Sequence, residues 1–192
     1  MQELKERIVK EGKVLPGNII KVDGFLNHRI DTGLLTRIAE EFGKYFNMDE
    51  VTMVLTAEAS GIALATAVAN YFHKPMIFAK KAKSDNIEGG LYQSDIYSYT
   101  YKKKVTLLVS KEWLSSDDKV LIIDDFMANG EAMRGLCDIV TAAGATLLGI
   151  GCAVEKGFQG GGDRLRAAGV NLKSLAIIES AEPGNIVFRD DD

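Results

Sequence analysis

The chain has 192 residues, of which 46% are hydrophobic and 26% are charged, values typical of a globular protein and not of a disordered or fibrous one. Its formal net charge of -4 gives no indication of the basic surface that nucleic-acid binding usually requires. No apolar run approaches the ~20 residues of a membrane span, and the charged amphipathic start does not resemble a signal peptide. We therefore expect one domain over residues 1–192 in the cytoplasm, without nucleic-acid or membrane partners.

The cysteines and histidines do not have the spacing of a metal site or a redox pair. Cys137 and Cys152 each lie in apolar sequence, and we interpret both as core residues. His28 and His73 have no ligand-type neighbour at helical or hairpin spacing. The sequence therefore predicts no metal bound by protein ligands alone and no catalytic histidine dyad.

The first part of the chain is expected to form a small lobe. Its elements are an amphipathic helix over residues 1–11, a turn and strand over residues 14–22 and a loop over residues 24–31. Leu4 and Ile8 would lie on one face of the first helix. Asp31 or Thr32 can cap the next helix, whose apolar positions are Leu34, Leu35, Ile38, Phe42 and Phe46.

Further along, short apolar runs alternate with helical stretches. The apolar runs, each bounded by turn residues, are residues 51–57, 75–79, 120–123, 146–154 and 174–178. Helices are expected between them, notably over residues 61–72 and 131–143. This alternation predicts an α/β fold with a mainly parallel sheet covered by helices on both faces. Ligands of such folds bind beyond the carboxyl ends of the strands.

Residues 80–109 interrupt this alternation. Their polar first part is typical of a loop, and the alternating Tyr and β-branched residues that follow predict an antiparallel hairpin. A polar excursion of this length directly after a strand is more often functional than idle. Lys80, Lys81 and Lys83 lie where the chain leaves the strand, so they could neutralise an anion bound at that edge of the sheet.

The most informative segment is VLIIDDFMANGEA, residues 120–132. Four apolar residues are followed by Asp124 and Asp125, a short turn and a helix that begins near Glu131. Two carboxylates at the end of a parallel strand can accept hydrogen bonds from vicinal hydroxyl groups. The free amides of a turn and of a helix start can hold a phosphate. The segment therefore predicts a sugar-phosphate site, with simple turn capping by the acids as the structural alternative.

Other nucleotide-binding patterns fit this chain less well. A nucleoside triphosphatase would need a GxxxxGK[ST] loop, and the sequence contains none. Gly149 and Gly151 open a GxG that lacks its third glycine, and the glycine-rich residues 157–162 do not have the spacing of a dinucleotide fingerprint. Rossmann-type cofactor binding is therefore not expected.

Residues 120–132 resemble the phosphoribosyl-diphosphate signature of the type I phosphoribosyltransferases. The resemblance covers essentially the whole chain, is closest to bacterial members that act on xanthine, and also rests on GFLNHRID, EASGIA, FAKKAKS and AVEKGFQGG. It implies a central, mainly parallel sheet flanked by helices, with a base-covering hood over about residues 1–30 and a flexible loop and hairpin. Many members have TGG or TGGT in the phosphate loop, which departs here from that pattern.

The resemblance also implies which residues bind the phosphoribosyl donor. Asp124 and Asp125 would hold the ribose hydroxyls and act in catalysis. The remaining donor contacts would come from a phosphate loop of Ala128, Asn129, Gly130, Glu131 and Ala132, a pyrophosphate loop of Ala59, Ser60 and Gly61, and a flexible basic segment with Lys80, Lys81 and Lys83.

Ile20, Asn27 and Lys156 are the residues that the resemblance assigns to the base. A cation at position 156 can donate to a 6-oxo group and to N7 of a purine, which favours 6-oxopurines over adenine. The Asn27 amide can donate to a 2-oxo group or accept from a 2-amino group, so it does not separate xanthine from guanine. Phe158 or Phe188 could stack on the ring.

The implied reaction belongs to purine salvage and converts xanthine and 5-phospho-α-D-ribose 1-diphosphate to xanthosine 5'-monophosphate and diphosphate. Magnesium would enter with the diphosphate, and the resemblance implies a homodimer. Hypoxanthine-guanine and adenine transfer are alternatives, as is a non-catalytic sensor of phosphoribosyl diphosphate. Such a sensor would be expected to carry a DNA-binding extension or a basic face.

Overall fold

The structure is a computed structural model that describes residues 1–81, 90–98 and 103–190. Its centre is a six-stranded sheet in the order β10-β9-β8-β7-β3-β4. The strands are β3 (Met53–Ala57), β4 (Met76–Ala79), β7 (Lys119–Met127), β8 (Thr146–Lys156), β9 (Leu172–Glu182) and β10 (Asn185–Phe188). Neighbouring strands are parallel except β10, which is antiparallel to β9. The prediction of a mainly parallel sheet is confirmed.

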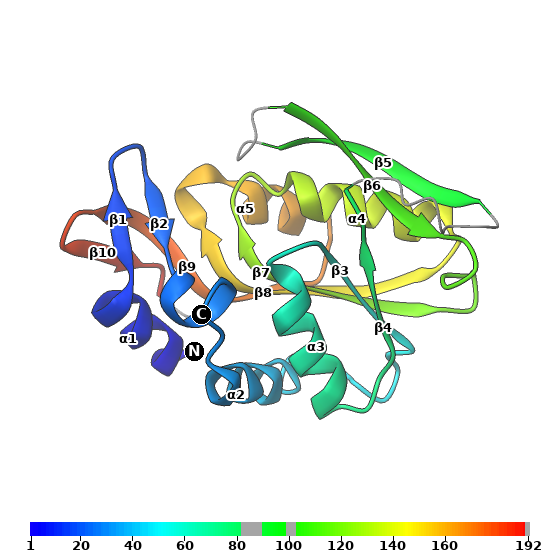
Figure 1. Cartoon of the computed structure of the whole chain (residues 1–192), viewed down its shortest axis with the longest axis horizontal. Helices are drawn as coiled ribbons and strands as arrows, with labels where there is room; N and C mark the ends of the chain where they lie inside the picture. Colours follow the sequence, from blue (N-terminus) through cyan, green and yellow to red (C-terminus); the bar gives the residue numbers. More distant parts are fainter. Residues whose placement is uncertain (82–89, 99–102, 191–192) are drawn as a thin grey trace.

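Helices cover both faces of this sheet. Figure 1 shows α2 and α3 below it and α4, α5 and the β5–β6 hairpin above it. The helices are α1 (Gln2–Glu11), α2 (Thr32–Phe42), α3 (Gly61–Tyr71), α4 (Glu131–Ala142) and α5 (Gly161–Ala167), and the two hairpins are β1 (Lys13–Leu15) with β2 (Ile19–Lys21) and β5 (Leu91–Ser98) with β6 (Lys103–Ser110). None of the helices in the described ranges combines the length and apolar composition that a bilayer span requires.

The central strand β7 shows why its sequence is continuously apolar. Leu121 and Ile123 pack into the core on the side of α2 and α3. Val120 and Ile122 pack into a second core, formed with α4 and the β5–β6 hairpin. Successive side chains of a strand point to opposite faces, so burial of both faces requires an apolar residue at every position.

The predicted end of this strand was wrong. The sequence pattern ended the strand at residue 123, whereas β7 continues to Met127. Asp124 lies opposite Cys152 and Phe126 lies opposite Val154 in the parallel partner β8. Because β8 itself runs to Lys156, its backbone continues to pair with β7 beyond the apolar run. The two acids therefore project from a paired strand and not from a turn.

The amino-terminal residues form a lobe that we call the hood, residues 1–30. It contains α1, the β1–β2 hairpin and a π-helical turn, η1 (Asp23–Asn27), where a loop was predicted. Its buried side chains, which include Leu4, Ile8 and Phe25, belong to the same core as those of α2 and α3. Asp31 caps α2, as predicted, by accepting a hydrogen bond from the Leu34 N–H at 3.0 Å.

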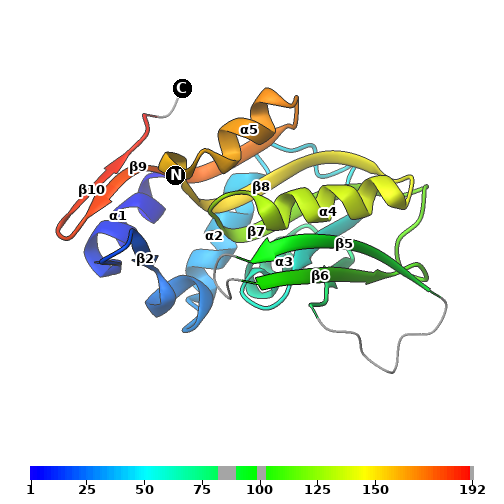
Figure 2. The same ribbon diagram turned by 90° about the horizontal axis from the view of Figure 1, so that it is seen from above.

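The hairpin predicted within residues 80–109 is confirmed as β5 and β6. Figure 2 shows it running alongside α4. Its second strand, β6, is joined to the segment that follows β4, because Lys80 and Leu108 exchange backbone hydrogen bonds of 2.9 and 2.8 Å. Gly135 of α4 allows the close approach, since a Cβ there would lie 2.5 Å from Ile96 Cγ2 and 3.0 Å from Leu107 Cδ1.

We predict that Gly135→Ala destabilises the protein. Overpacking against Ile96 costs about 1–3 kcal/mol, more than the ~1 kcal/mol that alanine contributes over glycine in a helix. Urea unfolding should therefore show a lower free energy of unfolding. Gly33→Ala in the first turn of α2 is the matched control, because its added Cβ would meet no atom closer than 3.4 Å. Equal or greater stability of Gly135→Ala would contradict this packing.

Candidate active site

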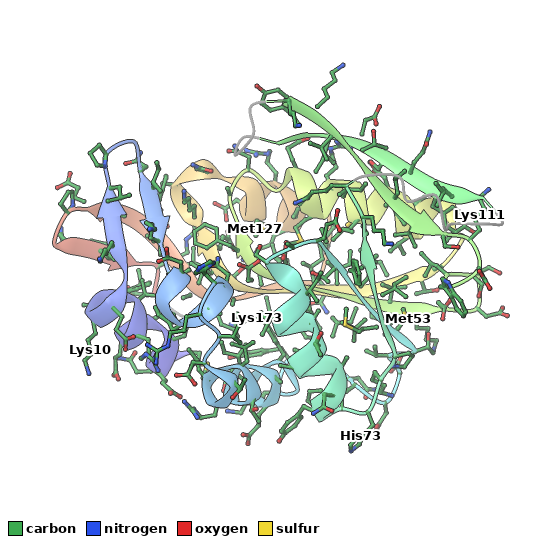
Figure 3. The ribbon with its side chains drawn as sticks, in the orientation of Figure 1. Lys10, Met53, His73, Lys111, Met127 and Lys173 are labelled. Atoms are coloured by element: carbon green, nitrogen blue, oxygen red, sulfur yellow. The ribbon has the colours of Figure 1, made fainter. Side chains whose placement is uncertain are left out.

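The carboxyl ends of β3, β4, β7 and β8 meet at one edge of the sheet, where a parallel α/β fold places its ligand site. A pocket of about 190 Å³ lies there. Met127, the last residue of β7, lines this pocket and is labelled in Figure 3. The same view shows His73 at the other end of α3, away from this edge.

This pocket collects most of the residues predicted to bind a phosphoribosyl donor. Those that line it are Ser60, Lys81, Asp124, Ala128, Asn129, Gly130, Glu131 and Ala132. They come from the loop after β3, the segment after β4, the end of β7 and the start of α4. Segments that are far apart in the sequence therefore line the same pocket.

Both acids lie almost buried, and of the two only Asp124 lines this pocket. Asp124 is 6% exposed and Asp125 is 1% exposed. The Asp125 N–H donates to Asp124 Oδ1 at 3.0 Å, and the start of α3 packs directly against the same oxygen. A Cβ on Gly61 would lie only 2.3 Å from it, so this predicted pyrophosphate-loop residue touches the acid pair and must lack a side chain.

Burial raises the pKa of the Asp124 carboxyl well above its ordinary value, and the negative charge of Asp125 raises it further. The positive charge of Lys81 opposes this shift. A carboxyl group whose pKa is raised by burial and by a second acid within a pocket is typical of a functional site. Asp124 lines the pocket, where a carboxylate can accept hydrogen bonds from the hydroxyl groups of a ligand.

The phosphate loop has the geometry of an anion site. Gly130 adopts a left-handed conformation, with φ of 79°, and α4 begins at the next residue. The first N–H groups of a helix have no partner within it, and they carry partial positive charge. Glu131 contributes this backbone, while its carboxylate pairs with Arg134 at 3.2 Å. The loop can therefore hold a phosphate without the threonine that many family members carry.

The predicted pyrophosphate loop, residues 59–61, joins β3 to α3 beside the acids. Ala59 lines a neighbouring cavity of about 660 Å³, together with Lys81, Lys103 and Lys104. The preceding residue ties this loop to the basic segment, because Glu58 Oε1 accepts a hydrogen bond from the Lys81 N–H at 2.5 Å. An elongated anion such as diphosphate would lie between backbone amides on one side and lysines on the other.

The three predicted lysines of the basic segment differ in their positions. Lys81 lines both cavities. Lys80 joins its backbone to Leu108 in β6, which places the segment at the end of the hairpin. Lys83 lies outside the described residues.

Two of the predicted base-binding residues connect the hood to the ends of the central strands. Asn27 Nδ2 donates to Asp125 Oδ2 at 2.8 Å. Lys156 Nζ donates to the Asn18 carbonyl at 2.9 Å, and burial lowers its pKa. The Ile20 side chain is buried in the core, so its backbone is the part available to a ligand. These two hydrogen bonds join the hood to Asp125 of β7 and to Lys156 of β8.

Phe126 is an aromatic residue of this site that the sequence interpretation missed. It lines the pocket, and its ring centroid lies 5.4 Å from Lys156 Nζ. Phe158 and Phe188, the residues expected to stack, pack against the same core as Phe126 but do not line this pocket. The error follows from the misplaced end of β7. The sequence pattern placed Phe126 in a turn, whereas it lies within β7 and lines the pocket.

A metal ion bound at this site would need oxygen ligands from a substrate and from water. The described ranges contain no group of three or more His, Cys, Asp or Glu side chains that could hold an ion. The two acids and the anion-binding loops fit a magnesium ion that keeps its waters and substrate oxygens, which is the usual habit of this ion.

Two comparisons with known proteins cover nearly the full chain. It is 52% identical over 193 residues to xanthine phosphoribosyltransferase from Lachnoclostridium phytofermentans, with 100% of each chain covered. It is 49% identical over 191 residues to the protein of the same name from Alkaliphilus metalliredigens, covering 100% of this chain and 95% of the relative.

Solved structures of low sequence identity share the fold. Adenine phosphoribosyltransferase from Giardia lamblia superposes with a TM-score of 0.75 at 20% identity, covering 90% of this chain and 96% of the other. The enzyme from Saccharomyces cerevisiae gives 0.74 at 18% identity, covering 91% and 97%. Residues 28–168, which contain the acids, both anion loops and Lys156, match the phosphoribosyl transferase domain, and the chain therefore belongs to the phosphoribosyltransferase family.

Proposed function

We propose that this protein is a xanthine phosphoribosyltransferase of purine salvage that works in the cytoplasm. It transfers the 5-phosphoribosyl group of phosphoribosyl diphosphate to N9 of xanthine, giving xanthosine 5'-monophosphate and diphosphate. The observation that carries the proposal is the position of Asp124 between the phosphate loop and the pyrophosphate loop in one pocket. Relatives about 50% identical over the whole chain bear the name of this enzyme.

Binding of the donor follows from the three parts of the pocket. The backbone amides of residues 128–132 hold the 5'-phosphate. Asp124 and Asp125 accept hydrogen bonds from the ribose hydroxyls, and charge-assisted bonds of this kind are about twice as strong as neutral ones. The amides of residues 59–61, with Lys81, hold the diphosphate. The sugar is thereby fixed between its two phosphate groups.

Catalysis consists mainly of positioning and charge stabilisation. The bond from C1' to diphosphate breaks before the bond to N9 is fully formed, which leaves positive charge on the ribose ring. The two buried carboxylates lie beside that charge, and the basic segment stabilises the departing diphosphate. One carboxylate also assists removal of the proton that the base loses. Magnesium, carried by substrate oxygens and water, neutralises the diphosphate when it is bound.

Selection of the base depends on the space under the hood. Lys156 donates to the Asn18 carbonyl in the structure, and the 6-oxo group and N7 of a purine can replace that carbonyl as acceptors. The 6-amino group of adenine offers no acceptor to the ammonium group. Asn27 lies on the side of the base opposite Lys156. Its amide donates to Asp125 and reaches the 2-position of the purine. Phe126 can stack on the ring.

The enzyme is also proposed to be a homodimer. The helix α3 is apolar on most of its surface, which is typical of a buried helix, yet a groove of about 400 Å³ opens between α2 and α3. Its apolar lining consists of Ile30, Leu35, Ala63, Ala67 and Tyr71. The surface that the sequence indicates for a dimer is the hairpin with Tyr97, Tyr99 and Tyr101. Tyr97 is exposed, and Tyr99 and Tyr101 lie outside the described residues.

The acid pair should be essential for donor binding. We expect the double substitution of Asp124→Asn with Asp125→Asn to weaken binding of phosphoribosyl diphosphate with magnesium by about a hundredfold or more, because two hydrogen bonds to charged groups are lost. Isothermal titration calorimetry measures this directly, and unchanged affinity would remove the acids from the site.

Asp124→Asn by itself separates loss of binding from loss of folding. The pKa of Asp124 is raised in the folded state, so its ionisation opposes folding once the pH exceeds the carboxyl's unfolded value of about 3.9. The substitution removes that penalty. The melting temperature near neutral pH should therefore equal or exceed that of the unsubstituted protein, and the difference should shrink as the pH falls toward 4.

Base specificity should depend on Lys156. We expect Lys156→Met to lower kcat/KM for xanthine by about tenfold to a hundredfold, since a hydrogen bond from a charged donor is lost, with little change in KM for the donor. Diphosphate release measured with xanthine, guanine, hypoxanthine, adenine and uracil gives the profile. Strong turnover of adenine by the unsubstituted protein would contradict the proposed specificity, and donor binding without product from any base would favour a sensor.

The dimer should depend on the α2–α3 groove. Analytical ultracentrifugation is expected to give a dimer for the unsubstituted protein and a monomer for Ala67→Lys, because a lysine in an apolar interface is buried without a partner. Val9→Lys is the control, since Val9 lies on α1 and is 62% exposed. A monomer without substitution would contradict the dimer, and a dimeric Ala67→Lys variant would contradict this surface.

A further inference from the structure

Glu155 is a fully buried acid that the proposed mechanism does not use. It precedes Lys156 in β8 and is 0% exposed. Both its oxygens are paired with Arg166 of α5, at 3.1 Å from Nη1 to Oε1 and 2.7 Å from Nη2 to Oε2. The Ser174 hydroxyl also donates to this carboxylate. A buried ion pair contributes little net stability compared with apolar packing, so its effect on geometry is the more informative property.

Two successive glycines place the start of α5 between this carboxylate and the phosphate loop. A Cβ on Gly162 would lie 2.0 Å from Glu155 Oε1. A Cβ on Gly161 would lie 2.4 Å from the Ala128 oxygen and 2.7 Å from the Gly130 nitrogen. The α5 backbone therefore contacts the ion pair on one side and the phosphate-loop backbone on the other. The position of α5 therefore sets the distance between the Glu155–Arg166 ion pair and the phosphate loop.

Arg164 connects this turn of α5 to one peptide group of the phosphate loop. Its Nη2 donates to the Asn129 carbonyl oxygen at 2.9 Å. That carbonyl and the Gly130 N–H belong to the same planar trans peptide, so they point in opposite directions. Because Arg164 holds the Asn129 carbonyl on the α5 side, the Gly130 N–H is turned toward the pocket. Asn129 and Gly130 both line that pocket. The guanidinium charge also polarises the peptide and strengthens its N–H as a donor.

We propose that Arg164 is a positioning residue for the phosphoribosyl donor, and that the Glu155–Arg166 ion pair positions Arg164 by holding α5 against the phosphate loop. This inference rests on the proposed function, in which that loop binds the 5'-phosphate. It gives the successive residues Glu155 and Lys156 separate tasks. Lys156 binds the base on the hood side of β8, and Glu155 supports the phosphate loop from the α5 side.

Steady-state kinetics with both substrates varied independently tests the proposal. Arg164→Gln and Gly161→Ala should each raise KM for phosphoribosyl diphosphate on the order of tenfold, because a small misplacement of a binding group has a large effect. KM for xanthine should change less than about twofold, since the base contacts are untouched. Arg164→Lys, which keeps a cationic donor, should recover much of the donor affinity.

Two variants serve as matched controls. Gly33→Ala adds a methyl group in the first turn of α2 without a close contact. Arg37→Gln removes an exposed arginine that is bidentate to Glu3, between α1 and α2. Both should keep the KM for the donor of the unsubstituted protein. An equal rise in KM for both substrates in Arg164→Gln, or no change for the donor, would overturn the positioning role.

Glu155→Gln should show the same selective loss of donor affinity. If it does not fold, because Arg166 loses its buried charged partner and keeps only the exposed Asp163, Arg164→Gln and Gly161→Ala still decide the question, since both keep the ion pair. Calorimetry on the unsubstituted protein separates this inference from the proposed function. No binding of phosphoribosyl diphosphate there would overturn both, whereas normal binding with an unaffected Arg164→Gln variant would overturn the positioning role alone.

Discussion

The parallel pairing of β7 with β8 beyond the apolar core is the constraint on which the rest of the site depends. The register continues through Asp124 opposite Cys152 and Phe126 opposite Val154. It therefore fixes the acid pair, the Phe126 ring and Lys156 on the sheet, while the loops after β3 and β7 only need to reach that edge. Side chains that project from paired strands hold their geometry better than side chains on loops.

The site is completed by groups that approach this edge from three directions. The hood contributes Asn27 and the Asn18 carbonyl, which already bond to Asp125 and Lys156. The start of α3 packs its bare Gly61 against Asp124, and α5 supports the phosphate loop from behind. These contacts give the buried Asp125 and the partly buried Lys156 hydrogen-bond partners within the protein.

Much of the architecture could be predicted because a strand buried on both faces of a sheet has a continuously apolar sequence. The apolar runs of β3, β7 and β8 were readable for that reason. Asp31, one of two candidate caps of α2, was readable because acidic and hydroxyl side chains bond the free N–H groups at a helix start. The short elements α5 and β10 were not predicted. Seven residues of a glycine-rich helix and a four-residue edge strand carry too few apolar positions to show a period, and both form by packing on neighbours.

By itself, the sequence determined the order of the chemical groups at this edge of the sheet. Two adjacent acids after an apolar strand, a small-residue loop and a helix start match a polyol and a phosphate, because carboxylates accept hydrogen bonds from hydroxyl groups and free amides bind phosphate. The tertiary structure decided which residues share the pocket. Continued pairing of β7 with β8 places Phe126 at the pocket. Arg164 and Glu155 are positioned by contacts with residues distant in the sequence, Asn129 and Arg166 respectively. Such contacts depend on how helices and strands pack, and local sequence patterns do not contain that information.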